Sequence, residues 1–228
     1  MAKADETRQR ILDAALDLFR RDGFDTATMR DIARQAGVAT GAAYYYYPSK
    51  EAIVMDFYRR AADAMQPKLS EVLDKERVLE GRLRETIRVK LAHFAPDRDV
   101  LRTLLRNGAD PRHPLSPFST ETREIRQTDI AWFRQMLVDC GTRIPRDLEP
   151  ALPGVLWFFQ MGVIFYWVTD ESTAQERTGR LLNLAAKVAA NLIRLAGLPL
   201  MRPARKTAVE LIALVESEPR RSTPEPPL

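Results

Sequence analysis

The sequence predicts an all-α protein made of a small N-terminal helix-turn-helix domain and a larger C-terminal helical domain. Apolar residues recur at helical spacing through most of the 228 residues, and the alternation typical of strands is absent. Prolines and glycines divide the chain into segments of helix length. A hydrophobic content of 45% excludes wholesale disorder, and the length allows one large core or two helical domains.

The first predicted helix covers about residues 5–21, and Gly23 ends it. Its apolar stripe consists of Ile11, Ala15, Leu18 and Phe19. Three basic residues, Lys3, Arg8 and Arg10, lie in its N-terminal arm. They either contact nucleic acid or form a solvated surface together with the acidic residues between them.

Residues 28–48 have the pattern of two short helices joined by a tight turn. Thr28 and Asp31 have the spacing of a capping box at the start of the first helix. Gly37 can adopt the positive φ that lets the chain turn sharply. Thr40 is expected to cap the second helix, although no acidic partner follows it.

The second of these helices carries four consecutive tyrosines, Tyr44 to Tyr47, before Pro48 ends it. Successive helical positions lie about 100° apart, so the four rings cannot share one role. We expect Tyr47 to point inward, as an ordinary core aromatic. Tyr44 and Tyr46 then reach towards phosphates, and Tyr45 projects into a DNA groove.

The small residues at the start of this helix leave room for base edges to approach. The formal net charge is only +4, so basic residues are used locally rather than as a general polycation. We expect base-edge contacts from one group and phosphate contacts from another. The first group is Thr40, Ala42, Tyr45 and Arg30, and the second is Thr28, Tyr44, Tyr46 and Lys50. The predicted DNA-binding set is Thr28, Arg30, Thr40, Gly41, Ala42, Tyr44, Tyr45, Tyr46 and Lys50.

Residues 6–55 resemble the DNA-binding domain of the TetR family of bacterial transcriptional regulators. The motifs that carry the resemblance are Gly23-Phe24, Thr28 to Ala33, Ala36 to Val38, Gly41, and Tyr44 to Glu51. Two positions depart from the family pattern. Ala39 stands where the family commonly has Ser, which removes a hydroxyl able to make a backbone or cap contact, and Tyr47 replaces the usual Phe. The resemblance covers less than a quarter of the chain.

A linking helix is predicted from Ser49, and Pro67 is expected to bend or end it and to mark a pivot. The longest interior break is the proline-rich loop from Gly108 to Pro117, a surface feature and in some proteins a lid. Further helices are predicted at about 78–95, 97–107, 118–140, 147–168, 173–197 and 203–216. The last residues, 218–228, are rich in proline and are expected to be disordered.

The segment from Ala151 to Val168 has no charged residue and is just long enough to span a membrane. Pro153 and Gln160 interrupt it, and its aromatic residues run through the middle instead of forming two interfacial belts. A helix that is apolar all round is also typical of a buried helix at a subunit contact. We therefore expect no membrane partner.

The next helix, at about 173–197, has a continuous apolar stripe with small residues beside it. Such a stripe either completes the subunit core or forms a contact between two copies of the chain. We expect a homodimer, because in proteins resembling the TetR family the last two long helices commonly form a four-helix contact between subunits. The predicted dimer contacts are Trp157, Leu184, Val188 and Leu192.

Residues able to do metal or nucleophilic chemistry are scarce. Cys140 is the single cysteine, and His93 and His113 are the only histidines. The sequence has no metal-ligand cluster, phosphate-binding glycine loop or serine elbow. We therefore expect a protein that is not an enzyme and needs no cofactor. The charged N-terminus, without a signal peptide, indicates the cytoplasm.

The predicted function is a ligand-responsive transcriptional repressor that binds a palindromic operator as a homodimer. The chain is predicted to have a DNA-binding domain at 1–48, a ligand-binding and dimerisation domain at 49–217, and a tail at 218–228. By resemblance, the helices around an apolar or aromatic effector carry His93, Phe94, Trp132, Phe133 and Met136. These residues could equally be core packing. A small-molecule-binding protein or enzyme using the C-terminal cavity, and a membrane-associated helical protein, are the alternatives.

Overall fold

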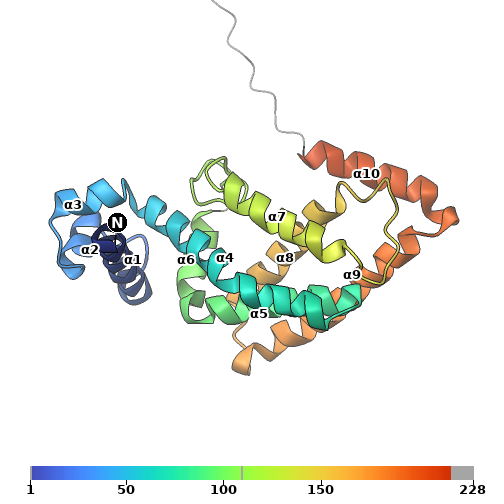
Figure 1. Cartoon of the computed structure of the whole chain (residues 1–228), viewed down its shortest axis with the longest axis horizontal. Coiled ribbons are helices and arrows are strands. Elements are labelled where there is room, and N and C mark those ends of the chain that lie inside the picture. The colour runs from blue at the N-terminus through green and yellow to red at the C-terminus, as the bar shows by residue number, and fades with distance from the viewer. Residues whose placement is uncertain (1, 109, 217–228) are drawn as a thin grey trace, which may run out of the picture.

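The computed structural model describes residues 2–108 and 110–216, and within these ranges it contains helices and no strand. The prediction of an all-α fold is confirmed. Figure 1 shows three helices grouped at one end of the molecule and joined by α4 to a larger group of helices. The tail at 218–228, predicted to be disordered, lies outside the described residues.

The N-terminal group consists of α1 (Ala2–Asp22), α2 (Met29–Gln35) and α3 (Thr40–Tyr46). Two glycines make its turns possible, since Gly23 has φ 86° and Gly37 has φ 65°, values that residues with a Cβ rarely adopt. The three helices share a buried core that includes Ile11, Ala15, Phe19, Ile32 and Ala43. The helix-turn-helix is therefore held by its own apolar faces.

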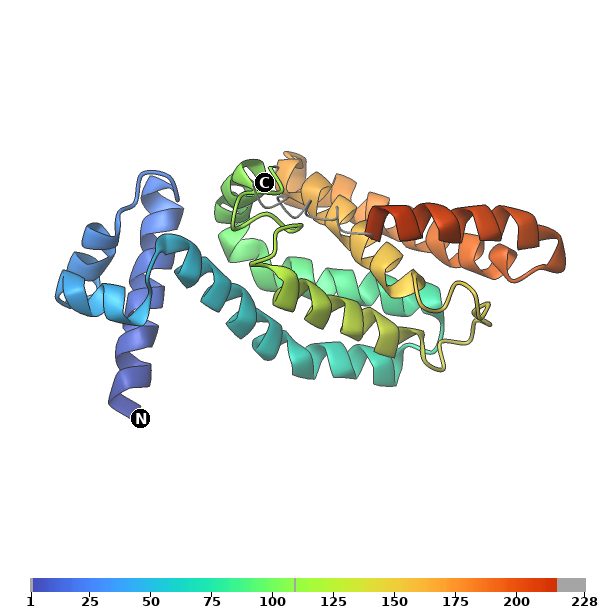
Figure 2. The ribbon, with the colours of Figure 1, turned by 90° about the horizontal axis from the view of Figure 1, so that it is seen from above.

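Helix α4 (Lys50–Lys75) connects this group to the rest of the chain. The Ser49 hydroxyl caps it by accepting a hydrogen bond from the Ala52 amide over 3.3 Å. Pro67 lies inside the helix and does not end it. Figure 2 shows that the helix changes direction part-way along, as expected where a proline removes a backbone hydrogen bond.

The larger group surrounds two further apolar clusters, one between α5, α7, α8 and α9 and one between α4 and α7. The first cluster, which fills the N-terminal group, continues into α4, α6 and the end of α8. The core therefore crosses the predicted domain boundary at residue 48. The helices of this group are α5 (Leu79–Phe94), α6 (Arg98–Asn107), α7 (Arg123–Leu137), α8 (Leu152–Thr169), α9 (Glu176–Ala196) and α10 (Arg202–Glu216).

Helix α8 is long and apolar enough to cross a membrane by length and composition, and half of its apolar window is buried inside the fold. A bent helix pair from Thr173 to Ile212 passes the same test as a single broken span. Both ends of α8 pack into clusters of the core, at Leu152 and Leu156 near its start and at Trp167 and Val168 near its end. Its apolar character is largely explained by this packing.

A buried carboxylate joins α1, α3 and α4. Tyr47, which directly follows α3, is buried as predicted, and its hydroxyl donates to Asp56 Oδ2 over 2.6 Å. Arg8 Nη2 donates to Asp56 Oδ1 over 3.2 Å, and Arg60 Nε donates to Oδ2 over 3.0 Å. Arg8, which we placed in a DNA-contacting or solvated arm, is therefore partly exposed and bonds inward to this carboxylate.

The ionisation of this junction follows from its surroundings. Burial alone would raise the pKa of Asp56, but the Tyr47 hydroxyl and the guanidinium groups of Arg60 and Arg8 outweigh it, and the pKa lies below its ordinary value. Burial, together with the hydrogen bond to Asp56, raises the pKa of Tyr47 to about 12. The carboxylate is thus ionised and the phenol neutral at physiological pH.

Replacing Tyr47 with Phe should lower the free energy of unfolding by about 1–2 kcal/mol, because a buried carboxylate loses a short hydrogen bond while the ring still fills its place. Urea denaturation followed by circular dichroism measures the change. Tyr44→Phe is the matched control, since the Tyr44 side chain is half exposed and its hydroxyl can reach water. Equal stability of the two variants would show that the Tyr47 hydroxyl does not hold the junction.

Candidate nucleic-acid interface and ligand cavity

The surface formed by α2 and α3 presents most of the predicted DNA-binding residues to solvent. Thr28, Arg30, Thr40, Gly41 and Tyr44 are exposed. Tyr45 is 84% exposed and packs the edge of its ring against Tyr46, with the ring centroids 5.3 Å apart. Ala42 and Tyr46 are partly buried. The four tyrosines thus divide into one buried ring and three that reach the surface.

Thr28 precedes α2 and caps its start, as predicted. Its Oγ1 accepts a hydrogen bond from the Asp31 amide over 3.2 Å and donates to the Asp31 carboxylate over 2.5 Å. The hydrogen bond from Thr28 and the charge of Arg34 lower the pKa of Asp31. The side chains of Thr28 and Asp31 are therefore joined at the start of this helix.

The expected cap of α3 is wrong. Ala39, not Thr40, is the residue that precedes the helix, and no side chain caps the helix start. Thr40 already belongs to the helix, so its hydroxyl is not in the position from which a cap accepts a backbone hydrogen bond. The departure at Ala39 has the consequence that the sequence suggested, since the missing hydroxyl leaves this end of α3 without a side-chain cap.

Lys50, which we predicted to hold a phosphate, has a hydrogen-bond partner within the protein. Its Nζ donates to the Phe24 carbonyl over 2.6 Å and lies 4.6 Å from the centroid of the Phe24 ring. A second contact runs to the Asp25 carbonyl over 3.3 Å. This side chain ties the start of α4 to the loop after α1.

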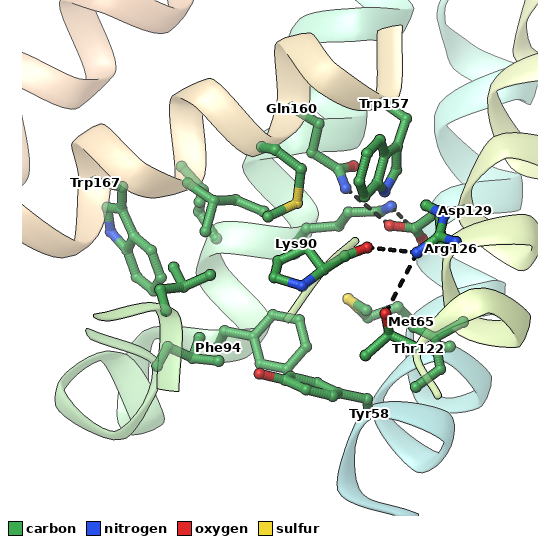
Figure 3. A pocket seen from close by; sticks show the side chains of 18 of the residues that line it. Tyr58, Met65, Lys90, Phe94, Thr122, Arg126, Asp129, Trp157, Gln160 and Trp167 are labelled. Carbon is green, nitrogen blue, oxygen red and sulfur yellow. Dashed lines mark hydrogen bonds and ion pairs between the residues drawn. The ribbon is translucent and has the colours of Figure 1, made fainter. Parts of the chain in front are cut away.

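A cavity of about 130 Å³ lies between α4, α5, α6, α7 and α8. Most of its wall is apolar. Figure 3 shows Asp129, Arg126 and Gln160 gathered at one end beside Trp157, with Phe94, Tyr58 and Trp167 around the rest. The loop that precedes α7 closes part of it through Leu115 and Pro117. Its aromatic lining consists of Tyr58, Phe94, Trp157 and Trp167, with Met65, Leu101, Leu105, Met161 and Ile164 among the aliphatic residues.

The polar side of the cavity is organised around Asp129. Lys90 Nζ, buried, donates to Asp129 Oδ1 over 2.7 Å, and Gln160 Nε2 donates to Oδ2 over 2.8 Å. Arg126 lies beside them and donates to the Pro117 carbonyl over 2.6 Å. Three helices, α5, α7 and α8, thus contribute one polar side chain each to a single cluster.

The predicted ligand residues are divided between the cavity and the core. Phe94 lines the cavity, and Trp132 lines a second hollow that shares Lys90 and Asp129 with it. Phe133 and Met136 are fully buried in the core between α5, α7, α8 and α9. His93 is half-buried, packs its ring edge against Phe94, and does not line either space. Phe133, Met136 and His93 thus lie outside the walls of both spaces.

The residues that give the cavity its polar side are not among the predicted ligand residues. Gln160 carried a signal, because it is a lone amide in an otherwise apolar helix. Lys90 carried another, since it lies three residues after Ile87 and four before Phe94, on the apolar face of α5. A polar side chain at such a position is buried only if a partner meets it.

The predicted dimer residues fall into an exposed group and a buried residue. Leu184, Val188 and Leu192 are 66%, 55% and 61% exposed and follow one face of α9. The opposite face of α9 is buried in the subunit core through Leu182. Trp157 differs from the prediction, because it is buried and lines the cavity instead of a surface.

Comparison with known families agrees with this architecture. Residues 11–56 match the profile of bacterial regulatory proteins of the tetR family, and residues 82–209 match the tetracyclin repressor-like C-terminal domain. Together the two matches cover more than half of the chain. The chain belongs to the tetR family of bacterial regulatory proteins. This family consists of transcriptional regulators, not enzymes.

Curated relatives of the chain match it over part of its length. The regulator SrpR of Pseudomonas putida is 53% identical over 49 residues, which are 22% of this chain and 23% of SrpR. The transcriptional repressor KstR2 of Rhodococcus jostii is 32% identical over 125 residues, which are 52% of this chain and 60% of KstR2. The chain thus spans less than two thirds of either relative.

Solved structures of TetR-family regulators share the fold. The regulator FadR of Bacillus subtilis, solved in complex with stearoyl-CoA, has a TM-score of 0.62 at 19% identity and matches 80% of this chain and 97% of its own. A TetR regulator from Nitrosomonas europaea has a TM-score of 0.61 at 21% identity, over 80% of this chain and 97% of its own. At such identities the likeness concerns the fold.

Replacing Ala39 with Ser should stabilise the helix-turn-helix by about 0.5–2 kcal/mol, because a serine hydroxyl at the N-cap can accept a hydrogen bond from a free amide of α3. Thermal unfolding measures the change. The control is Thr40→Ala, which removes a hydroxyl one residue later and should leave the stability nearly unaltered. Loss of stability in Thr40→Ala without gain in Ala39→Ser would contradict this assignment of the cap.

Proposed function

We propose that this TetR-family chain is a ligand-responsive transcriptional repressor that binds a palindromic DNA operator as a homodimer. The observation that carries the proposal is the division of the tyrosines on α3. Tyr47 is buried and holds the helix to Asp56, which leaves Tyr44 and Tyr45 on the exposed side. A helix fixed from within and rich in exposed hydroxyls suits a DNA groove.

The proposed contacts follow the exposure of these residues. Thr40, Ala42, Tyr45 and Arg30 would meet base edges, because they surround the exposed start and face of α3. Thr28, Tyr44, Tyr46 and Lys50 would hold phosphates on either side. Lys50 would do so while its ammonium also keeps the loop after α1 in place, since an ammonium has three donors.

The proposed dimer uses the outer faces of α8 and α9. Leu184, Val188 and Leu192 form an exposed aliphatic row on α9, and Phe158 and Phe165 are partly exposed on α8. An apolar surface of this extent favours burial against a second copy of the chain. A two-fold axis would place the two α3 helices about one duplex turn apart, roughly 34–36 Å, and would require a palindromic site.

The proposed route from effector to DNA is α4. Near its start Asp56 anchors the helix-turn-helix, and Tyr58, Ala62 and Met65 line the cavity further along the same helix. A ligand that fits one position of α4 better than another would therefore shift the DNA-binding equilibrium. The complex of FadR with stearoyl-CoA and the repressor KstR2 support a small-molecule input and a repressing output.

Replacing Tyr44 with Phe should weaken binding to every DNA sequence by roughly tenfold, because a hydroxyl that donates to a charged phosphate oxygen is lost. Replacing Tyr45 should instead alter the preference at one position in each half-site. Operator fragments selected from a random duplex pool, followed by fluorescence anisotropy at moderate salt, measure both effects. Tyr166→Phe, the same change on α8, is the control. Unchanged affinity in both Tyr44→Phe and Lys50→Ala would refute the phosphate contacts.

Replacing Leu184 and Leu192 together with Arg should convert the dimer to a monomer at micromolar concentration, because four charges would be buried without partners at a two-fold contact. Sedimentation velocity measures the state of the chain. Val138→Arg is the control, since Val138 is also an exposed aliphatic residue but follows α7. A double variant that remains dimeric would place the contact elsewhere.

A further inference from the structure

Gln160, which lines the cavity, has a buried acceptor that lacks a partner. Gln160 is 2% exposed, and its orientation is fixed because Nε2 donates to Asp129. Its Oε1 is buried and accepts no hydrogen bond from the residues that the structure describes. An unsatisfied buried acceptor costs free energy, so this atom favours a ligand that brings a donor.

A charged donor shares the Asp129 carboxylate with the Gln160 amide. Lys90 is 3% exposed, and its Nζ bonds to one oxygen of the same carboxylate that orients Gln160. An ammonium has three N–H groups, and the ion pair with Asp129 uses one of them. Asp129 also neutralises the charge of Lys90. The pair therefore suits a neutral polar group that accepts from Lys90 and donates to Gln160.

The remainder of the cavity defines the body of the ligand. Its wall carries the rings of Tyr58, Phe94, Trp157 and Trp167 (Figure 3), which favour stacking with a flat aromatic body. The volume of about 130 Å³ is close to the roughly 150 Å³ of an engineered apolar cavity that binds benzene. The space thus matches a single ring with a short substituent.

We propose that the cavity binds a small phenol, whose hydroxyl donates to Gln160 Oε1 and accepts from Lys90 Nζ. A hydroxyl does both through one oxygen atom, whereas an ether oxygen only accepts and a methyl group does neither. This inference rests on the proposed function only in treating the cavity as the effector site. Binding of the phenol itself does not depend on DNA.

Isothermal titration of the full chain with three para-substituted ethylbenzenes tests the proposal; the hydroxyl and methyl probes have the same shape, and the ether is larger by one methyl group. The probes are 4-ethylphenol, its methyl ether 4-ethylanisole, and 4-ethyltoluene, in which a methyl group replaces the hydroxyl. 4-Ethylphenol should bind roughly tenfold or more tightly than either of the others, because only it supplies a donor to Gln160 Oε1. This comparison needs no variant and is therefore independent of any folding defect.

A variant then assigns the preference to Gln160. In Gln160→Met the unpaired acceptor is replaced by an apolar side chain of similar length, so the ratio of the 4-ethylphenol to the 4-ethyltoluene affinity should fall towards one. Gln127→Met, the same change on the exposed face of α7, is the matched control and should keep the wild-type ratio.

Similar affinities for the three probes, no measurable binding of 4-ethylphenol, or a preference that survives in Gln160→Met would each overturn the proposal. The titration contains no DNA, so its failure is separate from failure of the proposed function. If 4-ethylphenol binds with the expected preference but never alters operator affinity, the ligand chemistry is supported and the proposed regulation is contradicted.

Discussion

The fold depends on the carboxylate of Asp56. It receives the Tyr47 hydroxyl from the end of α3, the Arg8 guanidinium from α1 and the Arg60 guanidinium from its own helix. Removing a charge from water is costly unless several donors replace the water, and here the donors come from α1, from α4 and from the residue that follows α3. Apolar contacts tolerate small rotations, whereas hydrogen bonds to one carboxylate depend on direction. The junction therefore fixes the angle at which α3 is presented.

Much of this architecture could be predicted, because it depends on residues that are close together in the sequence. Helical periodicity gave the elements, and the position of Tyr47 followed from its neighbours on a short helix. The cap of α3 was assigned one residue late, because Thr40 is a good capping residue by type, whereas the helix begins where the backbone leaves the extended conformation at Ala39. The partner of Tyr47 could not be predicted, since Asp56 is one of many acidic residues and only tertiary packing brings it to the phenol.

The cavity could not be predicted either, because tertiary packing brings its lining residues together from distant parts of the sequence. Aromatic residues at helical spacing either fill a core or line a cavity. Periodicity does not distinguish the two, because it does not give the distances between the packed helices. Phe133 and Met136 fill the core, whereas Trp157 lines the space. Buried polar residues are the more informative signal. Lys90 and Gln160 interrupt apolar faces on different helices, and such interruptions persist only where the side chains meet a partner or a ligand.

The relation between the two sites follows from their positions on α4. Asp56 and Tyr58 lie within one turn of the same helix, so the anchor of the helix-turn-helix and the wall of the cavity are almost the same segment. Because the Tyr47 hydroxyl beside α3 and the Arg8 guanidinium of α1 both bond to Asp56, a displacement of the first turns of α4 would carry α1 and α3 together. In the proposed dimer, a small rotation of each N-terminal group would change the separation of the two α3 helices, and binding to the proposed palindromic site would be sensitive to that change.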